Sequence, residues 1–383
     1  MARPAVIFGG ASPEHDISVL TGLQAARALA NAGRSPVCLY WTKLGEWYEV
    51  DASSEGGDFV DGAPRRARPL RLVVGPGGGF IAEGGALRKD RPLEIGPAVI
   101  CCHGAPGEDG TLQGALDLAG IAYTGPDAAS AALGMDKLAF GAVAAGAGLP
   151  VLPRVAAVAE DGFLPPFAGP YIVKPRFGGS SIGIAIASDG EAVAALLRQS
   201  VHLRAGAVVE PYRPAAADLE IAVRTHPGVA LSAISRPERG PSAASAASGS
   251  SGGSGMGAIY SYQQKYVGGE GMVSAPRQVN PELPGETAKV VREAATTVAG
   301  VVRLRGVARV DFLLDGEEVY VNEVNTIPGS LAKHLWVEPE VAFIDLLDAM
   351  LDEALRHPTT HWTTVGADGA ALRSAGGINA KLG

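Results

Sequence analysis

Short apolar runs alternate with segments of helical periodicity along the first third of the chain. The runs lie at 5–10, 35–42 and 97–102, and the helical segments lie at 20–33 and 111–120. Strand–helix alternation of this kind builds a parallel sheet with helices on its faces. We therefore expect the N-terminal part of the chain to form an open parallel α/β domain.

The pattern changes at about residue 128. A long alanine-rich helix is predicted at 128–148, and two apolar runs, 171–175 and 183–187, flank a glycine-rich turn. Two runs joined in this way favour a β-hairpin over a crossover. Further strands are predicted at 207–211, 219–225, 230–236, 307–314 and 318–325, with a long helix at 284–302. Such strands with helices packed to one side indicate an α+β region.

Two segments lack the composition of a packed core. Residues 240–256 are almost entirely glycine, serine and alanine, which behave as a flexible linker. This segment is either a tolerated surface insertion or a flexible connection to a mobile lid. The second alternative arises because the next segment carries candidate catalytic residues. Residues 357–383 are expected to form a flexible tail.

Composition narrows the class of protein. With 383 residues, 47% of them hydrophobic and 19% charged, the chain can form two or three domains with substantial cores. The net charge of −8 argues against nucleic acid or an anionic membrane as a partner. Three cysteines are too few for a disulfide framework, and we find neither a signal-peptide core nor an apolar stretch long enough to span a bilayer. We therefore expect a cytoplasmic protein.

A glycine-rich turn follows a lysine in KPRFGGSSIG, residues 174–183. Backbone N–H groups of such a turn, together with serine hydroxyls, can surround a phosphate, and Lys174 adds a point charge. The alternative is an ordinary glycine-rich hairpin. The motif is not a Walker P-loop, because the lysine precedes the glycines.

A more specific pattern is RVDFLLDGEEVYVNEVN, residues 309–325. Glu323 and Asn325 are two apart on a predicted strand and therefore share a face, which Asp311 on the preceding strand can join. Three oxygen ligands without histidine or cysteine suit Mg²⁺ bound together with phosphate oxygens. The alternative, a solvated polar face, fits less well because the neighbouring residues are apolar.

Three further polar segments are candidate binding loops. HGAPGEDG (103–110) and GGASPEHDIS (9–18) follow predicted strands, where open α/β sheets bind ligands. IYSYQQKYVGGEG (259–271) carries Lys265 and Tyr266 beside glycine-rich sequence, as a closing lid would. Each could also be an ordinary surface connection.

Six motifs, taken in order, resemble the D-alanine–D-alanine ligase family of the ATP-grasp superfamily. They are GGASPEHDIS, HGAPGEDGTLQG, AYTG with the later MDK, KPRFGGSSIG, YSYQQKY and RVDF…NEVNTIPG, and they cover residues 5 to about 336. The resemblance implies an N-terminal α/β domain (1–127), a central ATP-grasp subdomain (128–205) and a C-terminal ATP-grasp domain (206–356), with ATP between the last two.

The resemblance also implies which residues bind the nucleotide and its metal. Contacts to ATP are implied for Lys137, Lys174, Gly178, Gly179, Ser180, Ser181, Glu210, Pro211, Tyr212, Arg213 and Glu220. In this arrangement the lysines and the turn hold the phosphates, residues 210–213 face adenine, and Glu220 holds the ribose. Asp311, Glu323 and Asn325 would hold two Mg²⁺ ions, or Mn²⁺ instead.

The implied reaction forms an acyl phosphate from the first amino acid, whose carbonyl is then attacked by the amine of a second. Glu14 would anchor the first ammonium in a pocket lined by His103, while Arg309 and the backbone at Gly329 would stabilise the oxyanion. Ser180, Tyr266 and Glu14 would latch the lid, and Lys265 would reach the transferred phosphoryl group. Tyr266 favours an amine acceptor, since related depsipeptide-forming ligases of the vancomycin-resistance type carry histidine there. Family members are commonly homodimers.

The chain departs from the family after the metal-binding asparagine. Relatives read roughly PGMTSHSL, where a serine binds the carboxylate of the acceptor, whereas this chain reads PGSLAKHL. His334 therefore takes the place of the serine, between Lys333 and Leu335. Either base could bind a carboxylate, or both could face solvent. Three hypotheses follow: a D-alanine–D-alanine ligase, the same chemistry with another acceptor in a specialised or resistance pathway, and an inactive nucleotide-binding module.

Overall fold

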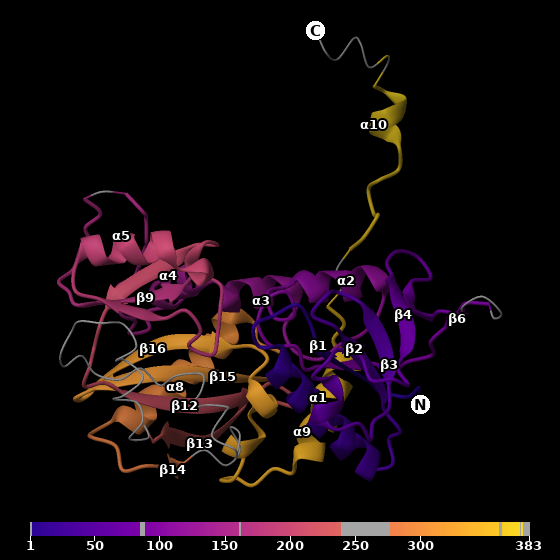
Figure 1. Cartoon of the computed structure of the whole chain (residues 1–383), viewed down its shortest axis with the longest axis horizontal. Coiled ribbons are helices and arrows are strands. Elements are labelled where there is room, and N and C mark those ends of the chain that lie inside the picture. The colour runs from indigo at the N-terminus through magenta and orange to yellow at the C-terminus, as the bar shows by residue number, and fades with distance from the viewer. Residues whose placement is uncertain are drawn as a thin grey trace.

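Three β-sheets, each with its own hydrophobic core, make up the computed structural model (Figure 1). The structure describes residues 2–84, 89–160, 162–238, 276–359, 362–375 and 377. The candidate lid residues Lys265 and Tyr266 therefore lie outside the described residues. Within those ranges, no helix combines the length and the apolar character needed to cross a membrane.

The N-terminal sheet has seven strands in the order β6-β5-β4-β3-β2-β1-β7. Its strands are β1 (Ala5–Gly9), β2 (Val37–Trp41), β3 (Trp47–Val50), β4 (Arg68–Val73), β5 (Gly79–Ala82), β6 (Arg91–Pro92) and β7 (Ala98–Ile100). Helices α1 (His15–Asn31) and α2 (Thr111–Ala119) and the short η1 (Gly56–Phe59) accompany it.

Only one end of this sheet, formed by β2, β1 and the edge strand β7, is parallel. β1 pairs in parallel with β2 and β7, but β2 through β6 pair antiparallel. The expected parallel pairing is therefore confirmed for β1, β2 and β7, but the expected parallel domain was wrong for residues 47–92, which add antiparallel strands that the sequence did not predict. Only residues 42–46 connect β2 to β3, and a connection this short permits a hairpin but not a crossover.

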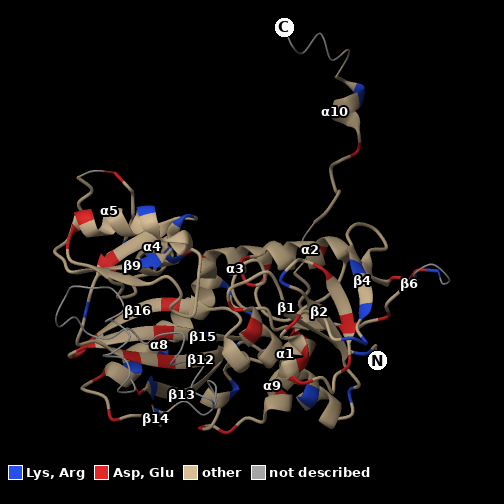
Figure 2. Cartoon of the chain, viewed as in Figure 1, with Lys and Arg blue, Asp and Glu red and all other residues tan. Residues whose placement is uncertain are grey.

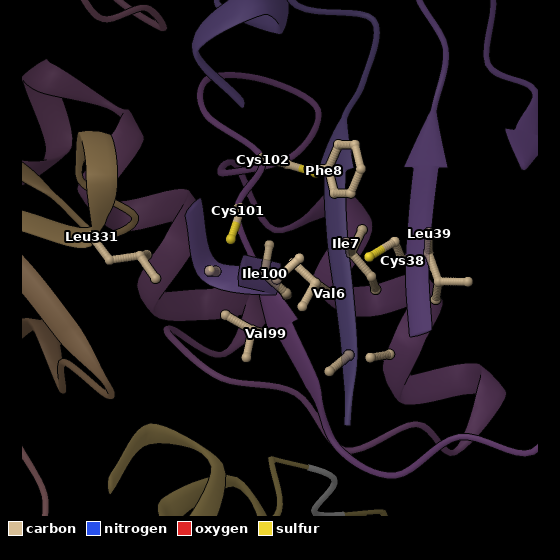
Figure 3. Packing of buried hydrophobic residues seen from close by; sticks show 14 of the residues in the cluster. Val6, Ile7, Phe8, Cys38, Leu39, Val99, Ile100, Cys101, Cys102 and Leu331 are labelled. Atoms are coloured by element: carbon tan, nitrogen blue, oxygen red, sulfur yellow. The ribbon is translucent and has the colours of Figure 1, made fainter. Parts of the chain in front are cut away.

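The core of the N-terminal sheet also contains residues from far along the chain. Figure 3 shows side chains of β1 and β7, with Cys101 and Cys102, and Leu331 beside them. Leu331, Ala332, Leu335 and Trp336 all belong to this buried cluster. The segment that differs most from the family is thus anchored in the N-terminal core.

The central sheet has the order β10-β9-β11-β8. Its elements are β8 (Val155–Ala156), β9 (Tyr171–Pro175), β10 (Ala185–Ala187), β11 (Ala207–Pro211), α5 (Gly190–Gln199) and η3 (Val201–Leu203). β9 and β10 pair antiparallel, which confirms the predicted hairpin. β11 pairs with both β9 and β8, so the strand at 207–211, assigned from the sequence to the C-terminal domain, belongs to the central sheet.

The single helix expected at 128–148 is instead two helices, α3 (Ala128–Met135) and α4 (Lys137–Gly146). Asp136 separates them, because its carboxylate accepts hydrogen bonds from the N–H groups of Leu138 and Ala139 and so caps α4. Arg176 also donates two hydrogen bonds to this carboxylate. The alanine-rich composition does not reveal this interruption, since an N-cap aspartate looks like one more helical position in the sequence.

The C-terminal sheet has five strands in the order β14-β13-β12-β15-β16. Its strands are β12 (Ala217–Arg224), β13 (Ala230–Pro237), β14 (Arg277–Val279), β15 (Val307–Asp315) and β16 (Glu318–Asn325), and helix α8 (Thr287–Val302) accompanies them. After β16, η6 (Gly329–Leu335) and α9 (Phe343–Arg356) pack on the N-terminal core, and α10 (Ala370–Arg373) follows. Apolar residues of α8 and α4 cover one face of the sheet. Because side chains alternate along a strand, the intervening positions, including Glu220 and Asp311, face away from α8.

Candidate functional site

A cleft lies between the central and C-terminal sheets. Lys137 at the start of α4, the turn after β9, the end of β11, and residues of β12, β15 and β16 line it. Its apolar walls come from Leu152, Ile172, Ile184 and Leu313. These walls provide an apolar slot beside charged groups, an arrangement that suits a flat apolar ring joined to an anionic chain.

The structure brings both predicted phosphate-binding lysines to this cleft. Lys174 Nζ donates to Glu210 Oε2 at 2.7 Å and to Asn322 Oδ1 at 3.0 Å. Lys137 Nζ donates to the Gly178 carbonyl and lies 3.4 Å from Glu323 Oε2. Two ammonium groups on the wall of one cleft can neutralise a polyphosphate.

The glycine-rich turn reaches from the cleft to the N-terminal domain. The Ser180 hydroxyl donates to Glu14 Oε1. At Gly179 a Cβ would lie 3.0 Å from Glu14 Oε2, so the absence of a side chain lets the turn approach this carboxylate. Ser180 and Ser181 have φ values of 51° and 60°, in the left-handed region that is rare for residues other than glycine. The structure therefore contains the predicted contact between Glu14 and Ser180.

A row of carboxylates crosses three adjacent strands. Glu220 on β12 pairs with Asp311 on β15, which in turn pairs with Glu323 on β16. Figure 2 shows acidic residues along these three strands. Arg309 forms two hydrogen bonds with Asp311, at 2.6 and 2.7 Å, and lies 3.8 Å from Glu220. Asn325 Nδ2 also donates to Asp311, at 3.0 Å.

These residues fit a hard divalent cation that is held partly by phosphate. Burial raises the pKa of Asp311 to about 6, and the neighbouring charges of Glu220 and Glu323 add to the rise, although Arg309 opposes it. A cation here would relieve this repulsion. Among the described residues, no group of three or more acidic, histidine or cysteine side chains is arranged to hold a metal alone. The amide of Asn325 and oxygens of a bound nucleotide would complete the ligand set.

Residues 210–213, predicted to face adenine, all line the cleft. The Glu210 side chain is 1% exposed and is engaged by Lys174. Arg213 lies 3.8 Å from Asp315 at the end of β15. The apolar side chains named above lie on the walls of the same cleft, so a planar base has both apolar surface and polar backbone within its reach.

A smaller cleft adjoins the first and shares Lys137, Gly178, Gly179 and Glu323 with it. Glu14 and Glu108 also line it. Glu108 was not singled out in the sequence beyond its place in the HGAPGEDG loop. Its carboxylate accepts hydrogen bonds from the N–H of Ile327 at 2.7 Å, the Thr326 hydroxyl at 3.2 Å and the N–H of Gly104 at 3.1 Å. Glu108 thus joins this loop to the segment that follows β16.

The Glu108 carboxyl also makes stability depend on pH. Burial, and then the Glu14 charge, raise its pKa from 4.5 to about 7 despite those hydrogen bonds. Between these values the unfolded chain has released the proton while the folded protein keeps it, so the contribution to stability falls as pH rises. In Glu108→Gln, which cannot titrate, the free energy of unfolding should gain on that of wild type by up to about 3 kcal/mol as pH rises from 4.5 to 7, as measured by denaturant titration at each pH. A difference that stays constant across this range would contradict the assignment.

His103 is buried and bonded on both sides. Its Nδ1 lies 2.7 Å from the Ile327 carbonyl, which only accepts, so Nδ1 carries the proton. Nε2 then accepts from the Thr21 hydroxyl at 2.8 Å, and Thr21 Oγ1 accepts the Ser330 N–H at 3.1 Å. Burial lowers the pKa of His103 to about 4, which keeps the ring neutral. His103 thus positions residues 327–330, and the described residues that line the two clefts do not include it.

Lys333 and His334, the two bases of the segment that departs from the family pattern (329–335), have different surroundings in the structure. Gly329 begins η6, and Ser330, Leu331 and Ala332 after it all have φ near 50°, a strained left-handed conformation. Lys333 lies with Nζ 5.1 Å from the centre of the Phe343 ring. His334 is 8% exposed, and within the described ranges neither of its ring nitrogens has a hydrogen-bond partner. Burial, with the charges of Arg277, Arg309 and Lys333, lowers its pKa well below 6.5.

Three residues at the site were missed in the sequence: Glu108, Arg154 and Asn322. Asn322 directly precedes the candidate residue Glu323, and Arg154 lies outside the predicted elements. Neither residue stands in a recognisable motif. Arg154 follows Pro153 in what reads as a connection, and Asn322 looks like the solvent-facing neighbour of Glu323. Only their tertiary contacts mark them.

Comparison with known proteins gives a consistent result. The family model described as D-ala D-ala ligase N-terminus matches residues 3–126, and D-ala D-ala ligase C-terminus matches residues 163–352. A D-alanine–D-alanine ligase of Bradyrhizobium sp. (strain BTAi1) is 33% identical over 369 residues, which cover 93% of this chain and 96% of that protein. One from Mycolicibacterium vanbaalenii is 30% identical, covering 93% and 98%.

Solved structures share the fold at lower identity. D-alanyl-alanine synthetase A from Vibrio cholerae superposes with a TM-score of 0.72 at 20% identity, covering 93% of this chain and all of that one. The VanG D-Ala:D-Ser ligase from Enterococcus faecalis superposes with a TM-score of 0.67 at 23% identity, covering 92% and 98%.

Proposed function

The chain belongs to the D-alanine–D-alanine ligase family, and we propose that it is an ATP-dependent ligase that joins D-alanine to D-alanine through an acyl phosphate. The observation that carries the proposal is the convergence of Lys137, Lys174 and the row Glu220–Asp311–Glu323 on one cleft. A set of cations beside a set of oxygen donors suits Mg²⁺-assisted transfer of a phosphoryl group.

The chemistry needs an anionic carboxylate to attack an anionic phosphate. Lys137 and Lys174 hold the phosphates and reduce the repulsion between the two anions. Mg²⁺, held by Asp311, Glu323 and Asn325, supplies further charge neutralisation when bound. Two ions are proposed, following the family resemblance. Arg309 is a buried guanidinium beside this site, and with the Gly329 backbone it stabilises the oxyanion of the second step.

The first amino acid is proposed to bind in the smaller cleft. Glu14 lines this cleft and can receive its ammonium group. Glu108 faces the same space, and its raised pKa reduces the negative charge that a substrate carboxylate meets there. The Ser180–Glu14 contact then links occupancy of the first site to closure of the phosphate turn.

The acceptor is proposed to be selected at His334. Its buried, neutral imidazole can donate to a carboxylate from one ring nitrogen, as the family serine would. The specific alternative is an acceptor other than D-alanine, and it is favoured by the replacement of this serine. The name of the VanG relative shows that this fold also hosts ligation to D-serine in that protein. A homodimer, a cytoplasmic location and the roles of Lys265 and Tyr266 are further parts of the proposal.

His334→Ser tests the acceptor assignment. We expect the ratio of kcat/KM between D-alanine and other acceptors to change about tenfold or more, because one pocket contact commonly contributes that much discrimination. The KM for ATP should not change. Lys333→Met tests the other base of the pair, which lies over Phe343 and is expected to leave the ratio unaltered. An unchanged ratio in His334→Ser would show that the imidazole does not contact the acceptor.

The function itself is tested by phosphate release with ATP, Mg²⁺ and pairs of D- and L-amino acids and hydroxy acids. Release with D-alanine alone, and a dipeptide product identified by mass, is the expected result. A strong preference for another acceptor would support the alternative ligase. Failure of every pair to release phosphate would contradict both and leave a nucleotide-binding module.

A further inference from the structure

Arg154 lies directly before β8 and joins three segments that carry the charged groups of the large cleft. Its side chain is only 5% exposed. Nη1 donates to the carbonyl of Lys137 at 2.9 Å, and Nη2 donates to the carbonyl of Asn322 at 3.2 Å. Its Nε lies 3.2 Å from Glu210 Oε1. One guanidinium therefore contacts α4, β16 and β11 at once.

Glu210 is shared between two cations. Lys174 binds Oε2 at 2.7 Å, while Arg154 lies against Oε1. Burial alone would raise the pKa of Glu210, but Lys174 and Arg154 together lower it, so the carboxylate is charged. Two positive charges and one negative charge leave a surplus of one positive charge in this buried group. Without Arg154, Glu210 and Lys174 would neutralise each other.

Within this group of three charges, the surplus positive charge lies on the side that faces the cleft. Lys174 lines the cleft, whereas Arg154 is not among the described residues that line it. Arg154 thus reaches a bound ligand only through the groups it holds. Besides Glu210, these are the backbone of Lys137, whose ammonium group lies in the cleft, and of Asn322, which accepts from Lys174 and precedes Glu323.

We propose that Arg154 is a positioning residue of the nucleotide site, which neutralises Glu210 so that the charge of Lys174 acts on a phosphate. It also fixes the backbone from which Lys137 and Glu323 project. The inference rests on the proposed function, because only that function assigns a phosphate to this cleft.

Gly141 on α4 makes room for this arginine. A Cβ at Gly141 would lie 2.4 Å from Arg154 Cδ and 2.7 Å from its Nε. Alanine is favoured over glycine in a helix, so Gly141→Ala should displace the arginine without breaking α4 or changing any charge. Gly146, at the end of the same helix, provides the matched control, since among the described residues no neighbouring atom lies within 4 Å of the position that a Cβ would take there.

The test compares Arg154→Met, Arg154→Lys and Gly141→Ala with wild type and Gly146→Ala. Calorimetry measures binding of a non-hydrolysable ATP analogue with Mg²⁺, and steady-state kinetics give separate KM values for ATP and for the amino acid. We expect Arg154→Met and Gly141→Ala to weaken analogue binding about 10- to 100-fold, the usual range for a hydrogen bond to a charged group. The KM for the amino acid should stay constant, and Arg154→Lys should recover part of the binding.

The Glu210→Gln background tests whether Arg154 acts by neutralising Glu210. Removal of the anion leaves nothing for Arg154 to neutralise, so Arg154→Met should cost much less binding in that background than in wild type. Equal losses in both backgrounds, or a parallel rise of both KM values, would overturn the inference. So would normal analogue binding by Gly141→Ala and Arg154→Met. Wild-type protein that binds no nucleotide would instead contradict the proposed function.

Discussion

Glu323→Gln and Asp311→Asn are each expected to lower turnover by about 10²- to 10³-fold, the usual cost of removing one group that stabilises transition-state charge. Both changes keep the shape of the side chain and remove a negative charge from the row on β12, β15 and β16. Because that row is assigned to Mg²⁺, the requirement for Mg²⁺ should also shift to higher concentration.

The measurement is the rate of phosphate release at saturating amino acid over a range of Mg²⁺ concentrations. A second readout is the rise in thermal midpoint that Mg²⁺ and ATP cause together, which both variants should diminish. Glu318→Gln is the matched control, because Glu318 is an exposed carboxylate at the start of the same strand and bonds only to Tyr320 among the contacts described. Wild-type turnover in Glu323→Gln would exclude the metal assignment.

The second large effect is expected for Lys174→Met. The change removes the ammonium group that lies between Glu210 and Asn322, and we expect the KM for ATP to rise with a loss of turnover of about 10²-fold. Glu210 keeps Arg154 as its ion-pair partner among the described residues but loses Lys174, so the folded protein should also lose about 1–3 kcal/mol of stability.

The sign of the pH dependence provides a further check on Lys174→Met. The pKa of Glu210 is lowered below 4.5 in the folded protein, against the effect of burial, chiefly by Lys174. A lowered carboxyl pKa stabilises the fold above pH 4.5, and this stabilisation is lost as pH falls. The stability deficit of the variant should therefore be complete above pH 4.5 and shrink below it. Lys289→Met, at an exposed lysine of α8, should show neither the kinetic nor the pH effect.

The chemistry of the site was more accessible from the sequence than its supporting contacts. Lys174, Asp311 and Glu323 were identified because each stands in a motif whose spacing fixes its face or its place at a strand end. The structure places these three on one cleft. Glu108 and Arg154 were missed, because a buried hydrogen bond or ion pair between positions far apart in the chain leaves no local periodicity.

The errors in the predicted fold came from weak strand signals and from a helix cap that the sequence pattern does not reveal. The parallel strands β1, β2 and β7 at one end of the N-terminal sheet follow from strand–helix alternation. The antiparallel strands β3 to β6 are short and partly exposed, so their apolar signal is weak. The break at Asp136 comes from its capping of α4, and Arg176, 40 residues away, also holds this carboxylate. Helix periodicity alone does not contain that contact.

The sequence by itself identified the family and the motifs that we assign to the nucleotide and the metal, because these motifs depend on local spacing and on residue types with restricted chemistry. Only the tertiary structure shows how residues 329–335, the segment that departs from the family pattern, are packed. The left-handed turn at 330–332 buries Leu331 in the N-terminal core, directs Lys333 onto Phe343 and leaves His334 buried among arginine charges. The two bases are adjacent in the chain, yet packing rather than spacing decides which of them can meet a substrate.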